Sequence, residues 1–221
     1  MHTIKNTLLA LLTALTLTTV NAENLTARLG TGYTMGHVVN GVQRSEGSVF
    51  AGLDLGVTYD KIDFSLSSVA LTGPSVSDWQ VGAAKNFVVT EGLTMRVGLD
   101  AYRHQLATSS TESVLSVAFQ NKYITPYIKG SYDFDLSEQG FIVGLTKDFT
   151  ICTVQIAPSV EFGNFESYSS FNTKICLSKN LFKHVQLFSS VGYYKNDGVP
   201  NYALEKLDGK FLSVGGVRWV F

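Results

Sequence analysis

The chain has 221 residues, of which 45% are hydrophobic and 16% charged, and 17 Lys and Arg stand against 18 Asp and Glu for a formal net charge of −1 at pH 7. This length suits one domain of ordinary size. The near-neutral balance excludes the strongly basic surface that a nucleic-acid-binding protein needs, so we expect no nucleic-acid partner.

The first 22 residues, MHTIKNTLLALLTALTLTTVNA, have the form of a secretory signal peptide. Lys5 lies in a short polar start, an apolar stretch runs from Leu8 to about Val20, and small residues follow. A short buried helix is the alternative, but the segment has no polar face. We therefore expect residues 1–22 to be removed after Ala22, which leaves residues 23–221 as one mature domain.

The mature chain shows alternation of apolar and polar residues with a period of two. In SVFAGLDLGVTYDK, residues 48–61, Val49, Leu53 and Tyr59 are apolar, whereas Asp54 and Asp60 lie at positions of the other parity. Such alternation is typical of a strand with one apolar and one polar face. No later stretch approaches the roughly 18 consecutive apolar residues of a membrane helix, so a membrane-spanning form would have to be a closed barrel.

Twelve segments have this pattern, each close to the roughly 9–11 residues of a tilted membrane-spanning strand. They predict an all-β fold, a closed antiparallel transmembrane β-barrel of about twelve strands, with ten strands as the alternative. The segments are residues 24–36, 48–59, 62–71, 78–87, 93–104, 113–121, 124–134, 140–149, 152–163, 171–180, 185–194 and 210–221.

The links between these segments alternate in length. Turns after the even-numbered segments are tight, such as Asp60–Lys61, whereas links after the odd-numbered ones are longer and polar, such as HVVNGVQRSEG at 37–47. In outer-membrane barrels the short turns face the periplasm and the long loops face outside. The pattern therefore places both chain ends on the periplasmic side.

The last strand, FLSVGGVRWVF, ends on an aromatic residue. This ending resembles the C-terminal signal of bacterial outer-membrane barrel proteins, and the matching positions are Gly216, Val217, Trp219 and Phe221, although Val214 stands where that signal often has a polar residue. The resemblance implies the outer membrane of a Gram-negative cell envelope as the location. It also implies outer-membrane lipid and the barrel-assembly machinery as partners, and small porin-like barrels are the nearest match in size.

Alternate residues of each strand face outward or inward, and we call these two sets the outward and the inward parity. Aromatic residues of the outward parity predict two membrane girdles, one at each interface. A soluble lipocalin-type barrel would reverse the two faces, and the C-terminal aromatic residue and the turn asymmetry favour the membrane form. The girdle residues we expect are Tyr33, Trp79, Tyr132, Phe162 and Tyr193 near the loops and Tyr59, Phe87, Phe149, Trp219 and Phe221 near the turns.

Charged residues of the inward parity are the candidate lining of a pore. Five of them are basic and five are acidic, so their net charge is zero. We expect such a lumen to have weak charge selectivity. Arg96 and Asp100, four residues apart on one face, are expected to belong to a network of opposite charges. The pore-lining residues we expect are Arg28, Asp54, Asp63, Arg96, Asp100, Lys129, Asp133, Glu161, Lys174 and Arg218.

The sequence predicts no catalytic residues, no metal site and no cofactor. None of His37, His104 and His184 has the serine two residues later that membrane-embedded hydrolases use, and Asp133 and Asp135 are too sparse a set for calcium. The function we expect is a porin-like passive channel for small hydrophilic solutes. The alternative is a closed structural barrel whose external loops bind a partner or a surface.

Two features fit this interpretation poorly. Pro158 lies in the middle of a predicted strand, where its missing N–H donor indicates a bulge or a wrong boundary. In the last strand Leu212, Val214 and Val220 occupy the face that is elsewhere polar.

Cys152 and Cys176 are predicted to be free thiols, although an oxidising periplasm would favour a disulfide. Cys152 has the outward parity and Cys176 the inward one. A hairpin centred near residue 168 would set Cys176 opposite residue 160, too far from Cys152 for a bridge.

Overall fold

The computed structural model describes residues 24–39, 42–72, 76–105, 109–135, 137–198 and 207–221, and its strands belong to one antiparallel sheet. The part of the chain so described includes no helix that is long and apolar enough to cross a membrane. The predicted signal peptide, residues 1–22, lies outside these residues. The strands are β1 (Asn24–Val39), β2 (Val42–Tyr59), β3 (Ile62–Leu71), β4 (Val76–Thr90), β5 (Leu93–Gln105), β6 (Ser109–Gln120), β7 (Thr125–Asp133), β8 (Glu138–Thr146), β9 (Phe149–Ile151), β10 (Val154–Phe165), β11 (Ser169–Phe182), β12 (Val185–Asn196) and β13 (Asp208–Val220).

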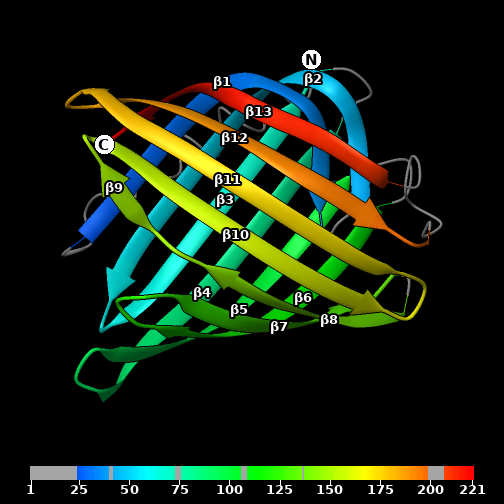
Figure 1. The fold of residues 1–221 in the computed structure, drawn as a ribbon, viewed down its shortest axis with the longest axis horizontal. Helices are drawn as coiled ribbons and strands as arrows, with labels where there is room; N and C mark the ends of the chain where they lie inside the picture. Colours follow the sequence, from blue (N-terminus) through cyan, green and yellow to red (C-terminus); the bar gives the residue numbers. More distant parts are fainter. Residues whose placement is uncertain (1–23, 40–41, 73–75, 106–108, 136, 199–206) are drawn as a thin grey trace.

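The sheet closes on itself into a barrel, which Figure 1 shows from the side. Strands adjacent in the chain pair around the ring, β13 pairs with β1, and β10 pairs with β11. The short β9 pairs only with the start of β10, beside the end of β8, so the ring has twelve strands and one extra piece. The predicted closed antiparallel barrel of about twelve strands is therefore confirmed, and the ten-stranded alternative is wrong.

Pro158 explains why the eighth predicted segment is divided into β8 and β9. In antiparallel strands the N–H and C=O groups of one residue point to the same side. The Pro158 carbonyl accepts bonds from the Lys147 backbone (3.2 Å) and from Thr146 Oγ1 (3.2 Å), so its nitrogen, which has no hydrogen, also faces this neighbour. The pairing with β10 stops at Thr146 and resumes at Phe149. Pro158 itself stays in register with β11, so the expected irregularity lies in the neighbouring strand.

The two ends of the barrel differ as the link lengths predict. Asp60 and Lys61 both have positive φ (47° and 63°), as do Cys152 and Thr153 (49° and 87°), which is the backbone of tight two-residue hairpin turns. These turns, the start of β1 and the C-terminus lie at the left of Figure 1, and the strand ends that the longer links join lie at the right.

The first long link differs from its prediction. Residues 37–47 were expected to be a loop, but β1 runs to Val39 and β2 begins at Val42, with a register shift between His37 and Val38. The strands continue to pair beyond the apolar band. Their outer ends lack the regular alternation that the prediction used.

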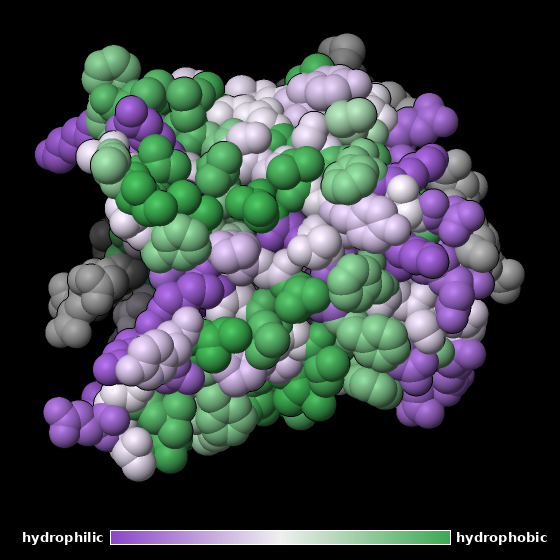
Figure 2. Space-filling view, in the orientation of Figure 1, coloured by the Kyte–Doolittle hydropathy of each residue, from purple (hydrophilic) through white to green (hydrophobic). Residues whose placement is uncertain are grey.

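The barrel wall has two chemically different faces. The rings of Phe50 on β2 and Phe188 on β12 lie 6.0 Å apart with β13 and β1 between their strands, so they point to the concave, inward side. The opposite parity bears large exposed hydrophobic side chains, such as Val81 (58% exposed) and Leu99 (59%). On the face shown in Figure 2, apolar side chains lie over the middle of the wall and hydrophilic residues lie at both ends.

The seam between β1 and β13 is closed by unusually close backbones. A Cβ atom on Gly32 would lie 2.1 Å from the Gly215 oxygen and 2.7 Å from the Cα atom of Gly216, its partner across the seam. The chain end continues this pairing, because Phe221 donates its N–H to the Ala27 carbonyl (2.9 Å) and accepts from the Ala27 N–H (3.3 Å). The terminal residue is therefore part of the wall.

Candidate functional site: the lumen

The ten charged residues predicted to line a pore all have inward parity. Cross-strand partners point to the same side of the sheet, and following them around the ring places all ten residues on the side of Phe50 and Phe188. Arg28 lies opposite Asp54, Arg218 opposite Gly30, and Lys174 opposite Gly192. Their role in conduction stays a prediction.

Arg96 forms an ion pair that joins β5 to β3 across β4. Its Nη1 atom lies 2.6 Å from Asp63 Oδ2 and 3.3 Å from Asn86 Oδ1, and Thr58 Oγ1 donates to Asp63 at 2.9 Å. Both side chains of the pair remain about one third exposed, at 36% for Arg96 and 32% for Asp63. Arg96 is thus part of a network, but its carboxylate partner is Asp63.

Asp100 belongs to a separate set of contacts. Its Oδ1 accepts from Gln80 Nε2 at 3.0 Å, and Ser67 Oγ donates to the Gln80 oxygen at 3.3 Å. A Cβ atom on Gly82 would lie 2.0 Å from Asp100 Oδ1, so this glycine provides the space for the carboxylate. Arg96 and Asp100, which were expected to belong to one network of opposite charges, thus lie in two separate sets of contacts, because each side chain reaches across neighbouring strands.

A second ion pair joins β7 to β10. Lys129 Nζ lies 3.5 Å from Glu161 Oε1, the Tyr127 hydroxyl donates to the same oxygen, and Lys129 Nζ lies 4.9 Å from the centre of the Tyr127 ring. The ring passes over Gly144, whose Cβ position would be 2.4 Å from Tyr127 Cζ. We call the inward residues Asp63, Arg96, Asp100, Lys129 and Glu161 the charged wall.

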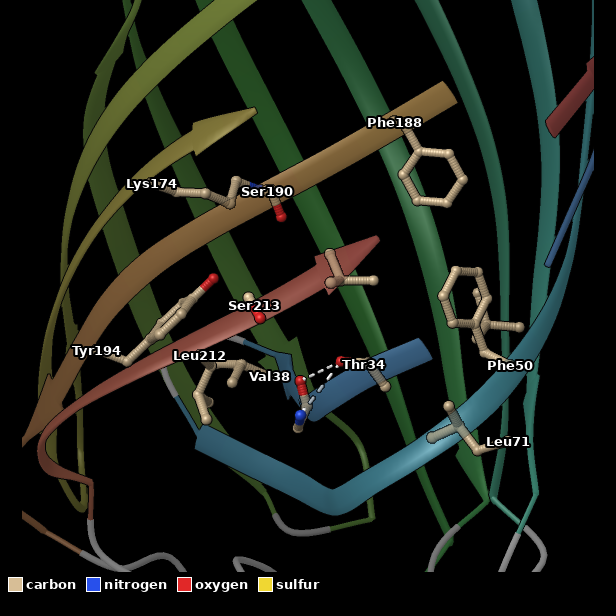
Figure 3. A pocket seen from close by; sticks show the side chains of 13 residues that line it. Thr34, Val38, Phe50, Leu71, Lys174, Phe188, Ser190, Tyr194, Leu212 and Ser213 are labelled. Atoms are coloured by element: carbon tan, nitrogen blue, oxygen red, sulfur yellow. Dashed lines mark hydrogen bonds between the residues drawn. The ribbon is translucent and has the colours of Figure 1, made fainter. Parts of the chain in front are cut away.

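The other side of the lumen is apolar and borders a cavity of about 280 Å³. Figure 3 shows side chains from β1, β2, β3, β11, β12 and β13 around this cavity. Leu212 and Val214, which fitted the sequence pattern poorly, lie in this surface. Seven hydrophobic residues line it, and we call all of them except Val38 the apolar wall: Phe50, Val69, Leu71, Phe188, Leu212 and Val214.

Most of this surface was not predicted from the sequence. Phe50, Val69, Leu71 and Phe188 all have the inward parity, and that parity was the available signal. The four residues lie on three strands, however, and only the register shows that they face one cavity. Arg218 borders the same region, since its guanidinium carbon lies 5.4 Å from the centre of the Phe188 ring and its Nε donates to Gln186.

The register also adds charged residues to the inward face. Glu46, Asp78, Glu112, Glu138 and Lys210 share the inward parity near the loop end, where Asp133 lies opposite both Glu112 and Glu138. With four acids and one base added to five of each sign, these inward residues number six bases and nine acids. The expected balance is therefore shifted by three negative charges.

The ten predicted girdle aromatics all have the outward parity. Tyr59 is 64% and Phe221 68% exposed, and Phe87, Tyr132, Phe149 and Phe162 are also exposed. This exposure agrees with a nonaqueous environment around the barrel, but the girdle role itself stays a prediction.

Both cysteines are free, as predicted, but the register differs from the expected one. Cys176 lies opposite Ala157 and Cys152 lies in the turn between β9 and β10. No group of three or more His, Cys, Asp or Glu residues that could hold a metal ion occurs within the described ranges.

No family model and no curated protein matches the sequence. Solved structures with a similar fold include the NanC porin, with a TM-score of 0.58 and 13% identity over 89% of this chain and 99% of that one. The KdgM porin has a TM-score of 0.57 and 12% identity over 90% and 99% of the two chains. An outer membrane channel from Pseudomonas putida F1 has a TM-score of 0.56 and 12% identity over 89% and 94%. These likenesses show that the chain has the fold of small porin-like barrels.

Proposed function

We propose that the protein is a porin-like passive channel of a bacterial outer membrane for small hydrophilic solutes. The observation that carries this proposal is the contrast between the two faces of the wall. Hydrophobic side chains are exposed outward, whereas ion pairs and hydrogen-bonded polar groups face the lumen. This arrangement suits a barrel with lipid outside and water inside. The similar fold of the channels described above supports the same function.

The outward face makes outer-membrane lipid the proposed surroundings of the barrel. Export through the predicted signal peptide and recognition of the last strand by the barrel-assembly machinery are part of the proposal. The residues proposed for that recognition are Gly216, Val217, Trp219 and Phe221. Trp219 and Phe221 are exposed at the turn end, where a partner can reach them.

Charge selectivity of the channel is proposed to be weak, with a small preference for cations. Arg96 and Lys129 are each paired with an acid, which reduces the field that they exert on a passing ion. The additional acids near the loop end give the inward face a small negative excess. No catalytic role is proposed for any residue.

Single-channel recording in planar bilayers tests this function. Purified barrel, shown to be folded by its faster migration on gels before boiling, is expected to give discrete conductance steps in KCl. The boiled, unfolded sample is the control and is expected to give none. A folded sample that never conducts in any salt would contradict the channel and favour the closed structural barrel.

A further inference from the structure

We propose that the apolar wall and Lys174 form a binding site in the lumen for small organic anions with an apolar body, such as aryl or alkyl carboxylates. This proposal rests on the proposed channel function and adds a solute class to it. The site is the cavity of about 280 Å³ in Figure 3, whose edge is formed by Lys174, Ser190 and Tyr194.

Apolar surface is exposed inside the barrel at this cavity. Phe50, Val69, Phe188 and Val214 are only half-buried and line open space, although the Phe50 and Phe188 rings also contact one another. Apolar surface in contact with water is unfavourable in proportion to its area, and contiguous patches of this kind mark binding sites. An apolar ligand body would remove that surface from water.

The polar edge of the cavity has the chemistry of an anion site. Among the described residues that line the cavity, Lys174 is the one charged residue and neither Asp nor Glu occurs, while Arg218 contacts Phe188 from outside this lining. Glu161 lies on the neighbouring β10, two residues from Ser159, the register partner of Lys174. It is in contact with Lys129 and Tyr127 and also attracts Lys174 electrostatically. Ser190 and Tyr194 add hydroxyl groups that can donate to a carboxylate.

The seam between β1 and β13 supports the site from beneath. The Phe50 and Phe188 rings lie 6.0 Å apart above the paired glycines Gly32 and Gly216, which hold the backbones close without side chains between the rings. A Cβ atom on Gly216 would lie 3.0 Å from Phe188 Cζ. The rings are thus placed by a rigid seam, and a preformed surface loses less entropy when a ligand binds.

Equilibrium binding to the detergent-folded barrel tests the site independently of conduction. The probes are phenylacetate, 2-phenylethylamine and gluconate, measured by calorimetry at pH 7. We expect phenylacetate to bind at least tenfold more tightly than either of the others, because only phenylacetate has both the apolar ring and the negative charge. Equal affinity for phenylacetate and 2-phenylethylamine would overturn the role of Lys174. Equal affinity for phenylacetate and gluconate would overturn the role of the apolar wall.

Matched variants separate the two parts of the site. Lys174→Gln is expected to weaken phenylacetate binding about tenfold, which corresponds to one charged hydrogen bond. Lys179→Gln, on the outward face of the same strand, is expected to leave it unchanged. Leu212→Asn is expected to weaken binding roughly tenfold. Val114→Asn, at an inward position on the opposite side that is as deeply buried (6% exposed against 8%), is expected to have no effect.

The same probes in planar bilayers distinguish this site from the channel function. A barrel that binds phenylacetate in detergent but never conducts would retain the site and contradict the channel. A barrel that conducts but does not bind phenylacetate would retain the channel and contradict the site. If both hold, phenylacetate should reduce the current in wild type and not in Lys174→Gln at the same concentration.

Discussion

The charged wall and the apolar wall are formed by the same alternating pattern, but their inward side chains are stabilised differently. On the charged wall, polar side chains reach across one or two strands, as Arg96 does to Asp63 and Tyr127 does to Glu161. On the apolar wall, Phe50 and Phe188 lie over a glycine pair and contact one another. The comparison teaches that parity determines which face a residue joins, whereas the neighbouring strands determine what that face can bind.

Glycine has a different role in each wall. Gly82 and Gly144 provide space for Asp100 and for the Tyr127 ring, and both spaces are filled by flexible side chains. At Gly32 the nearest atoms belong to the backbone of the opposite strand. A side chain at this position could be accommodated only by separating β1 from β13, so the apolar wall depends on the seam more than the charged wall does.

The largest effect is therefore expected from Gly32→Val. It would overpack the seam against the Gly215 and Gly216 backbone and destabilise the barrel by about 3 kcal/mol or more, which would prevent closure in much of the sample. The measurement is the fraction of heat-modifiable, folded protein on gels. Gly130→Val is the control, since nothing lies within 4 Å of its Cβ position, and it should fold as wild type does. Equal folding of both variants would show that the seam tolerates a side chain.

Arg96→Ala addresses the charged wall. It leaves Asp63 without its cation, so we expect a larger conductance and a cation-to-anion permeability ratio raised about twofold, by the attraction of a single-sign site for the opposite ion. Stability should fall by only about 1 kcal/mol or less, because the pair is partly solvated. Reversal potentials in a KCl gradient measure the ratio.

Arg103→Ala is the matched control, because Arg103 lies on the same strand at the outward parity. It should leave the permeability ratio as it is in wild type. If Arg96→Ala and Arg103→Ala have the same ratio as wild type, Arg96 does not line the conducting path.

The smallest effect is expected from Tyr127→Phe, which removes the hydroxyl that donates to Glu161 and keeps the ring above Gly144. The free energy of unfolding in urea should fall by about 1 kcal/mol, the typical contribution of one hydrogen bond. Tyr132→Phe, at an outward position of the same strand, should change it by less than about 0.5 kcal/mol. An unchanged free energy for Tyr127→Phe would show that the lysine alone holds Glu161.

The sequence was sufficient to predict the strands and their faces, because a membrane-spanning wall imposes strict alternation on each strand. Where that constraint ends, the prediction failed. The outer parts of β1 and β2 pair as far as Val39 and Val42, yet their sequence has the polar character of a loop.

Contacts between strands could not be predicted in the same way. Arg96 and Asp100 share a strand and a face, but Asp63 is the partner because the register of β3, β4 and β5 brings it within reach. Cys176 was expected opposite residue 160 and lies opposite Ala157, a shift of three residues that comes from the position of the hairpin bend. Hairpin registers depend on turn geometry, and small errors there move whole sets of contacts.

The pairing of Phe221 with Ala27 also has a consequence for the order of folding. Hairpins such as β2–β3 join segments that are close in sequence and can form locally, whereas the seam joins the first described strand to the last residue. Contacts of such long sequence separation form slowly, because a large loop must be closed first. Until residue 221 has arrived, β1 and β13 are two open edges that can pair with any other strand, so a chain delayed at this stage is exposed to aggregation.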